Sequence, residues 1–271
     1  MAREFRPADA QVHLHKIDPK DTNGTVNDAK LAQRVQERMK ELYDLHYLMF
    51  AENKRALLIV LQGIDASGKD GLVRHLASGL NPQGVRVWSF KQPSDVELDH
   101  DYLWRVHRAM PGRGEIAIFN RSHYEEVTVV KVHPELIARQ NLPDELAHPK
   151  SLFKHRYRQI NQFERMMSEN GTVILKFFLH ISKEEQEKRF EERLRDPRKH
   201  WKFAKGDLLE RQYWEAYMDA FQDMIEHTNT DYAPWYILPA DNKWYRDYAA
   251  LSIVVSTLNK LNMTFPTLKS L

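Results

Sequence analysis

The chain has 271 residues and no cysteine, which excludes disulfides and thiolate metal sites. No apolar run approaches the roughly 18 residues of a membrane-spanning helix, and the N-terminus lacks an apolar signal core, so we expect a soluble, cytoplasmic protein. The 40 basic and 38 acidic side chains give a net charge of +2, so the overall charge identifies no partner and only local clusters are informative.

The first 26 residues are mostly polar and contain Pro7, Pro19 and Gly24, and we interpret them as an extended N-terminal arm. Over residues 27–53, apolar side chains recur at the three- and four-residue spacing of an amphipathic helix. We assign residues 27–271 to a single domain that begins with this helix.

Residues 56–61 form a short, wholly apolar run followed by glycine, which is typical of a strand buried on both faces of a parallel sheet. Similar runs occur at 85–90, 116–119, 172–179 and 235–238, and helical patterns lie at 71–79, 99–108, 150–169, 183–194, 207–227 and 245–261. This alternation predicts an α/β fold, a parallel sheet sandwiched by helices. Ligands of such sheets bind beyond the carboxyl ends of the strands.

The segment between the first strand and the next helix fits the phosphate-binding pattern G-x-x-x-x-G-K, from Gly63 to Lys69. Its glycines let the backbone N–H groups point at an anion, and the helix N-terminus adds partial positive charge. Lys69 supplies a full charge for a transferring phosphoryl group. The pattern predicts a P-loop whose phosphate-binding residues are Gly63, Ala66, Ser67, Gly68, Lys69 and Asp70.

Two residues depart from an ordinary P-loop. Asp70 stands where Ser or Thr usually holds magnesium, and Asp65 lies inside the loop. A carboxylate facing phosphates is repelled unless a cation lies between them or it takes up a proton. Asp65 is therefore a candidate magnesium ligand, or a base that orients the attacking phosphate oxygen; the alternative is a hydrogen bond to the loop backbone.

A second candidate cluster follows the strand at 116–119. Arg121 is placed to stabilise charge on a transferring group, and Glu125 and Glu126 are candidate metal ligands. The alternative is a helix start in which Ser122 is the N-cap and Glu125 completes a capping box. Capping would account for Glu125 but not for Arg121.

Residues 188–202 contain seven Lys or Arg against three Asp or Glu, and Arg189 and Arg193 share a helix face. A helix, a basic turn and a second helix resemble the arginine-bearing lid of nucleotide kinases, so we predict a helical lid over about 186–212. The predicted phosphate-binding residues here are Arg189, Arg193 and Lys202, joined by Arg105 upstream. The alternative is a solvated charged hairpin with ordinary pairs such as Glu185–Arg189.

Taken together, these motifs resemble the polyphosphate kinase 2 family over residues 31–261. The matching segments are 63–70, 103–105, 119–125, 189–190, Arg193, 196–197, 201–202, Trp214, 233–235 and 239–243.

The resemblance implies a P-loop kinase fold and a reversible transfer of the terminal phosphate of inorganic polyphosphate to a nucleotide, with magnesium or, in its place, manganese. It gives Asp65 and Lys69 the family's P-loop roles and Arg121 its phosphate-contacting role, and we expect the catalytic residues to be Asp65, Lys69, Arg121 and Glu125. The sequence of residues 120–125 looks like the subgroup that accepts both AMP and ADP, with Glu125 helping to hold metal or nucleotide. A dimer or tetramer is also implied.

Two other functions remain open. An ATP-dependent nucleotide or small-molecule kinase would share the P-loop and lid. A non-catalytic polyanion binder is disfavoured because Asp65 and Lys69 both lie within the loop. The expected partners are polyphosphate with AMP, ADP, ATP or their guanine equivalents, and neither nucleic acid nor a membrane.

Overall fold

The computed structural model describes residues 5, 7–9, 11–202 and 205–267. Its centre is a five-stranded sheet in the order β2-β3-β1-β4-β5, in which every pairing is parallel. The strands are β1 (Ala56–Gln62), β2 (Val85–Ser89), β3 (Ile116–Asn120), β4 (Thr172–His180) and β5 (Trp235–Pro239). All five predicted strands are present.

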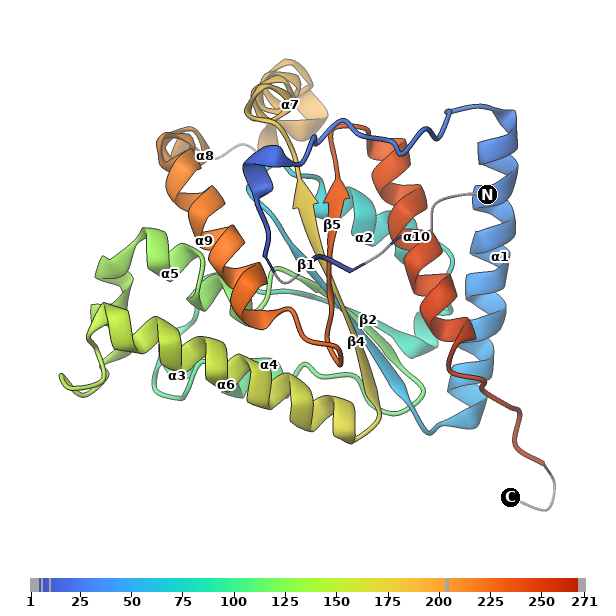
Figure 1. Ribbon diagram of the computed structural model, residues 1–271, viewed down its shortest axis with the longest axis horizontal. Coiled ribbons are helices and arrows are strands. Elements are labelled where there is room, and N and C mark those ends of the chain that lie inside the picture. The colour runs from blue at the N-terminus through green and yellow to red at the C-terminus, as the bar shows by residue number, and fades with distance from the viewer. Residues whose placement is uncertain (1–4, 6, 10, 203–204, 268–271) are drawn as a thin grey trace.

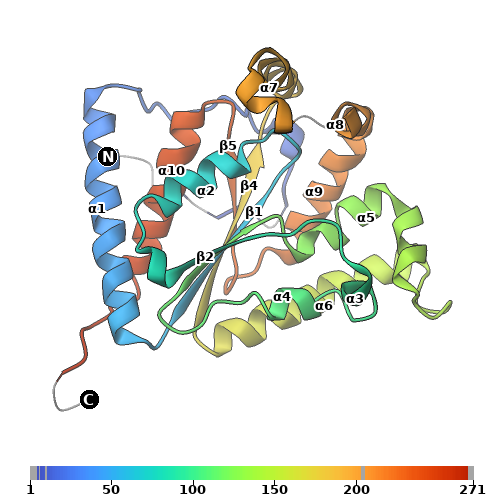
Figure 2. The same cartoon turned by 180° about the vertical axis from the view of Figure 1, so that it is seen from behind.

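Helices cover both faces of the sheet, as predicted (Figures 1 and 2). On one face α2 (Lys69–Ala77) and α10 (Lys243–Asn259) pack against the strands, and α1 (Ala29–Glu52) packs outside α10. On the other lie α6 (Pro149–Glu169) and α9 (Trp214–Thr228). The shorter helices are α3 (Asp95–Leu98), α4 (Trp104–His107), α5 (Val129–Val132), α7 (Lys183–Arg195) and α8 (Lys205–Glu210).

The burial of each strand can be compared with its composition. Every residue of β1 is buried, as expected for a central parallel strand covered on both faces. The edge strand β2 contradicts that expectation, because Val87 and Trp88 are 45% and 42% exposed. It has a strand neighbour on one side only, and helices leave much of its surface open.

Two predicted helices are wrong in extent. Of the helix predicted over 99–108 only α4 is formed, because the Asp101 carboxylate accepts a hydrogen bond from Leu103 N at 3.0 Å and forms a local turn before it. The helix predicted over 207–227 is divided into α8, a 3-10 turn at Arg211–Tyr213, and α9. In this turn Arg211 donates to Lys183 O of α7.

The described part of the N-terminal arm lies along β5 and α9. Ala8 N donates to Trp235 O at 2.7 Å, and Asp241 N donates to Pro19 O at 3.2 Å. Val12 and Leu14 of the arm are buried in the main core. None of the described helices is long and apolar enough to cross a membrane.

Candidate active site

The loop between β1 and α2 has the curled backbone of a phosphate cradle. Gly63 and Gly68 have φ values of 149° and 103°, and Ala66 between them has a φ of 65°. A Cβ at Gly63 would lie 2.8 Å from Leu179 O of β4, so only glycine fits against the neighbouring strand. The loop therefore sits at the carboxyl end of the sheet, where ligands of such folds bind.

Lys69 begins α2 and folds back over this loop. Its Nζ donates to Gly63 O at 2.6 Å and to Ile64 O at 3.1 Å. Burial, together with the nearby charge of Arg121, lowers the pKa of Lys69 to about 8, although Asp65 and Glu125 oppose that change. The ammonium group is thus held inside the cradle and stays mostly protonated at neutral pH.

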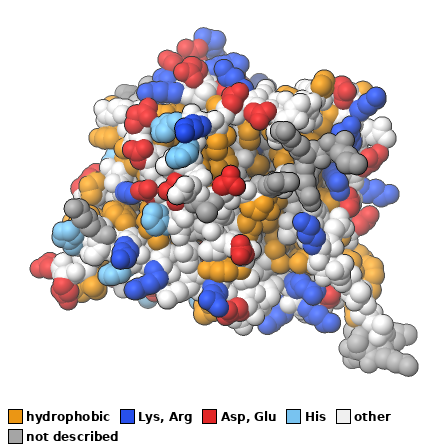
Figure 3. All heavy atoms as spheres, in the orientation of Figure 1, with side chains coloured by type: hydrophobic (Ala, Val, Ile, Leu, Met, Phe, Trp, Pro, Cys, Tyr) orange, Lys and Arg blue, Asp and Glu red, His pale blue; other side chains and the backbone are white. Residues whose placement is uncertain are grey.

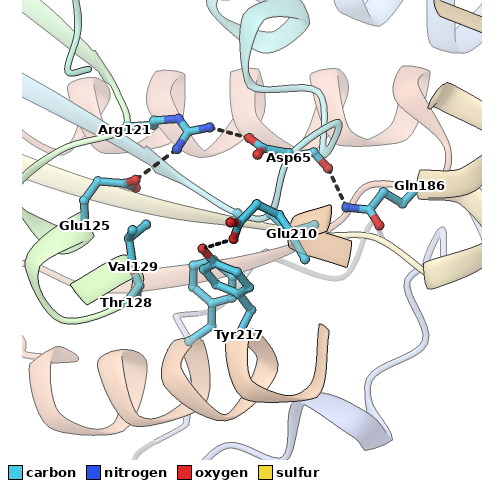
Figure 4. A pocket seen from close by; sticks show the side chains of 11 residues that line it. Asp65, Arg121, Glu125, Thr128, Val129, Gln186, Glu210 and Tyr217 are labelled. Atoms are coloured by element: carbon cyan, nitrogen blue, oxygen red, sulfur yellow. Dashed lines mark hydrogen bonds and ion pairs between the residues drawn. The ribbon is translucent and has the colours of Figure 1, made fainter. Parts of the chain in front are cut away.

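Arg121 joins the two carboxylates of the site (Figure 4). It donates to Glu125 Oε2 at 3.0 Å through Nη1 and pairs with the Asp65 carboxylate through Nη2. Glu125, and then Asp65, raise the pKa of Arg121 against the effect of burial. Glu125 therefore reaches Arg121, and no capping box is formed with Ser122.

Arg121 follows β3 in an unusual backbone conformation, with a φ of 64°. Its N donates to Leu61 O of β1 at 3.2 Å, which fixes the turn against the strand that carries the P-loop. A non-glycine residue in the left-handed region is strained and occurs most often at functional sites. The turn aims the guanidinium at the loop instead of at solvent.

A pocket opens beside the side chains of Asp65, Arg121 and Glu125. It is lined by Gly63, Ile64, Asp65, Arg121, Glu125, Thr128, Val129, Gln186, Glu210, Tyr217 and Phe221. Opposite the charged cluster, Tyr217 of α9 donates to Glu210 of α8 at 2.8 Å, and Val129 and Phe221 add apolar surface. One side of the pocket is therefore charged, and the opposite side combines the Glu210 carboxylate with aromatic and aliphatic groups.

The acidic groups of this pocket suit a magnesium ion held jointly with a substrate. Asp65 and Glu125 supply hard oxygen ligands, and magnesium is usually bound by one or two carboxylates plus substrate phosphates. Among the described residues, no three His, Asp or Glu side chains group closely enough to hold a metal by themselves. Oxygen atoms of the substrate would therefore have to complete the coordination.

Glu126 does not join this cluster, so the geometry corrects its predicted role as a metal ligand. Its carboxylate is almost fully buried, lies 3.2 Å from Arg156 Nη1 and accepts a hydrogen bond from Gln140. The 3-10 turn at His123–Glu126 sends neighbouring glutamates in different directions. Glu126 belongs to a structural ion pair.

Arg189 of α7 lies behind the cradle. Its Nη1 donates to Ala66 O at 2.9 Å and to Ser67 O at 2.8 Å, and its Nη2 donates to Ala240 O at 2.5 Å. It also forms the Glu185–Arg189 pair that the charged-hairpin alternative expects. In this structure Arg189 therefore supports the loop from outside, and its side chain is not aimed at an anion shared with Arg193.

The remaining predicted binding residues are spread more widely. Arg193 lies with its guanidinium 5.3 Å from the Phe190 ring centre. Arg105 donates to Lys91 O at 2.8 Å and does not line the pocket. The side chain of Lys202 lies outside the described part of the chain. Asp70, in the first turn of α2, accepts a hydrogen bond from Asn120 at the end of β3 at 2.8 Å.

Sequence reasoning missed the pocket residues that α7, α8 and α9 contribute. Gln186 donates to Asp65 O at 3.0 Å, and Tyr217 lies across the pocket from the loop. Neither belongs to a motif of recognisable spacing, and only the packing of α9 beside the loop brings Tyr217 into the site. Arg246 was missed for the same reason, although it touches the back of the cradle at Gly68.

Comparisons with known proteins identify relatives of the whole chain. The model of the family described as Polyphosphate kinase 2 matches residues 25–266. An "ADP-polyphosphate phosphotransferase" of Rhodopseudomonas palustris is 46% identical over 232 residues, covering 86% of this chain and 80% of the relative. An "AMP/ADP-polyphosphate phosphotransferase" of Meiothermus ruber is 46% identical over 259 residues, covering 95% and 92%.

A solved structure gives the same result for the fold. The crystal structure of Polyphosphate Kinase 2 from Arthrobacter aurescens TC1 superposes with a TM-score of 0.88 at 36% identity. The match covers 98% of this chain and 94% of that one, so it includes the helices around the pocket as well as the sheet.

Proposed function

The chain belongs to the polyphosphate kinase 2 family, and from this premise we propose that it transfers the terminal phosphate of inorganic polyphosphate, reversibly, to AMP and ADP. The observation that carries the proposal is the convergence of Asp65, Arg121 and Glu125 in one pocket at the mouth of the P-loop. Both substrates are polyanions, so the site must offset repulsion between them.

The residues divide this task between them. The loop N–H groups and Lys69 hold the donor phosphates, and Arg121 stabilises charge on the phosphoryl group in transfer. Asp65 orients the attacking phosphate oxygen. Magnesium, or manganese in its place, would be held by Asp65 and Glu125 and would neutralise phosphate charge. Little covalent chemistry is required of the protein, because positioning and electrostatics dominate phosphoryl transfer.

The acceptor range is supported by the pocket and by the relatives. The two relatives at 46% identity are named for ADP in one case and for AMP and ADP in the other. Glu125 lines the pocket and is proposed to help hold a metal ion when the acceptor is short, and the neutral Asn120 donates to Asp70. We propose that AMP and ADP are both accepted, with guanine nucleotides as alternatives.

The segment that contains α7 and α8 is proposed to act as the lid. It stands over the carboxyl end of the sheet, and basic and acidic side chains crowd together around the α7 end of the molecule (Figures 1 and 3). Closure would exclude water, which competes with the nucleotide as acceptor of the phosphoryl group. We also propose a homo-oligomer, a dimer or tetramer, on the family resemblance.

The test is an acceptor panel. The purified protein is incubated with polyphosphate, magnesium and each of AMP, ADP, GMP and GDP, and the products are separated by ion-exchange chromatography. We expect ADP and ATP from AMP, and ATP from ADP. If only ATP serves as donor and polyphosphate yields nothing, the protein is an ATP-dependent kinase and the proposal fails.

A further inference from the structure

A buried ionic network lies directly beneath the site and takes no part in the chemistry described above. Lys176 of β4 donates from Nζ to Glu164 Oε2 of α6 at 2.6 Å and to the Tyr124 hydroxyl at 2.8 Å. The Tyr124 hydroxyl donates in turn to Glu164 Oε1 at 2.6 Å. All three side chains are fully buried.

The buried His123 borders this network, with its Nε2 3.5 Å from Glu164 Oε1, and the Lys176 ammonium group is fully paired. The third N–H of Lys176 reaches Thr228 O at 2.7 Å, so every proton of the ammonium group has an acceptor. Burial raises the pKa of Tyr124, which keeps its hydroxyl a proton donor, and the charge of Lys176 holds the pKa of Glu164 below its ordinary value despite burial. The three groups therefore have defined donor and acceptor roles.

Stability alone does not explain this arrangement. A buried ion pair is costly to desolvate, and well-packed apolar residues of similar volume are often equally or more stabilising. Aromatic side chains pack against it, and the ring centre of Trp235 lies 4.9 Å from that of Tyr124. What the network adds is a fixed position for the Tyr124 side chain, because its hydroxyl is bound by both Glu164 and Lys176.

Tyr124 lies in the turn that carries the catalytic side chains, between Arg121 and Glu125. The upper part of this turn is held by Ser122, whose Oγ accepts from Gln62 at 3.1 Å and from Tyr124 N at 3.2 Å. The lower part is held through the Tyr124 hydroxyl and through the Glu126 carboxylate, which pairs with Arg156 of α6. The turn is thus tied to β1, β4 and α6 at once.

We propose that Tyr124, Glu164 and Lys176 are positioning residues, which lock the turn after β3 so that Arg121 and Glu125 face Asp65 across the P-loop. The functional part of this inference rests on the proposed phosphotransfer. A displacement of about 1 Å at such groups can lower turnover by roughly a hundredfold, so a hydroxyl outside the pocket can control the rate.

The test is Tyr124→Phe, which removes the hydroxyl and leaves the ring. The matched control is Tyr157→Phe on α6, because Tyr157 is also buried but its hydroxyl has no hydrogen-bond partner among the described residues. Hydrogen exchange measured by mass spectrometry on the folded proteins should be faster over residues 121–127 in Tyr124→Phe only. This readout does not depend on the reaction.

Kinetics supply the second readout. We expect Tyr124→Phe to lower kcat by at least about tenfold and to raise the half-saturating magnesium concentration, with Tyr157→Phe unchanged in both. A smaller folded fraction would lower the rate but leave the half-saturating concentration unaltered. If the wild type makes no product from polyphosphate, the proposed function fails, and the exchange comparison then decides the positioning role.

A pair of double variants isolates the anchoring bond. Lys176→Met with Glu164→Gln keeps an acceptor for the Tyr124 hydroxyl, whereas Lys176→Met with Glu164→Leu removes it, and neither buries an unpaired charge. We expect the first double variant to retain several-fold more activity. The inference is overturned if the two double variants are equally active. It is also overturned if Tyr124→Phe matches Tyr157→Phe in hydrogen exchange or in kcat.

Discussion

Arg121 is the residue on which the site depends most. It holds two carboxylates that repel each other, and it does so in a strained backbone conformation that aims it at the loop. A guanidinium can bridge both groups because its donors are arranged in a planar fork, whereas an ammonium group offers a single point charge.

This geometry predicts a large effect for a substitution that keeps the charge. Arg121→Lys should lower kcat by roughly a hundredfold, because one ammonium cannot hold Asp65 and Glu125 together and stabilise the phosphoryl group. Arg38→Lys, at an exposed pair with Glu41, is the control and should keep normal kinetics. An Arg121→Lys protein with more than half of the wild-type kcat would remove the bridge from the account.

Lys69 gives a prediction for pH. Its pKa of about 8 in the free protein means that the ammonium group loses its proton as pH rises through 8. We therefore expect kcat/KM to fall by roughly tenfold per pH unit above that point. Because this pKa lies below the ordinary value of 10.5, the unfolded state binds more protons between pH 8 and 10.5.

The contribution of Lys69 to folding stability therefore increases with pH between pH 8 and 10.5. Deprotonation of Lys69 would not unfold the protein in this range, so it cannot cause a loss of activity by unfolding. Circular dichroism at each pH provides the control. A kcat/KM that stays constant between pH 7 and 9.5 would contradict the proposed role of the Lys69 ammonium group in binding phosphate.

At the scale of elements, the sequence predicts the framework well and its edges poorly. The apolar runs that became β1 and β4 had to be buried on both faces, and the glycines of the cradle had to follow β1, so the P-loop could be located by pattern. The run at β2 mixes Arg86 and Ser89 with its apolar residues, and it lies at the sheet edge. Strand order depends on distant contacts, which local pattern does not report.

Arg189 shows the same limit within one helix. Its spacing to Arg193 indicated a shared phosphate, but the fold places it behind the cradle, where it donates to Ala66 O and Ser67 O. A charge count cannot distinguish an arginine that binds an anion from one that holds backbone carbonyls. The orientation of α7 against the loop decides between these roles.

The two roles predict different results for Arg189→Met. Loss of its backbone hydrogen bonds should lower the free energy of unfolding by roughly 2–4 kcal/mol in the absence of any ligand. Arg193→Met, one turn further along α7, should have a much smaller effect. Urea denaturation of the ligand-free proteins measures both. If Arg189→Met is as stable as wild type and only its KM for polyphosphate rises, the arginine is a ligand and not a support.

At the scale of the whole molecule, the site is assembled from segments far apart in the chain. The loop after β1, the turn after β3, and side chains from α7, α8 and α9 meet at the carboxyl end of the sheet. The first two could be predicted because strand ends in a parallel sheet share one edge. Tyr217 and Glu210 could not, because their place depends on how α8 and α9 pack against the finished sheet.

The most direct test of the central claim follows phosphate from polyphosphate to nucleotide through this pocket. Polyphosphate labelled with ³²P is incubated with AMP, magnesium and either the wild type or Asp65→Asn, and label in ADP is measured. We predict transfer by the wild type and a loss of roughly a hundredfold or more in Asp65→Asn, with its melting temperature nearly unchanged. Absence of label with the wild type, or Asp65→Asn activity within threefold of it, would contradict the account.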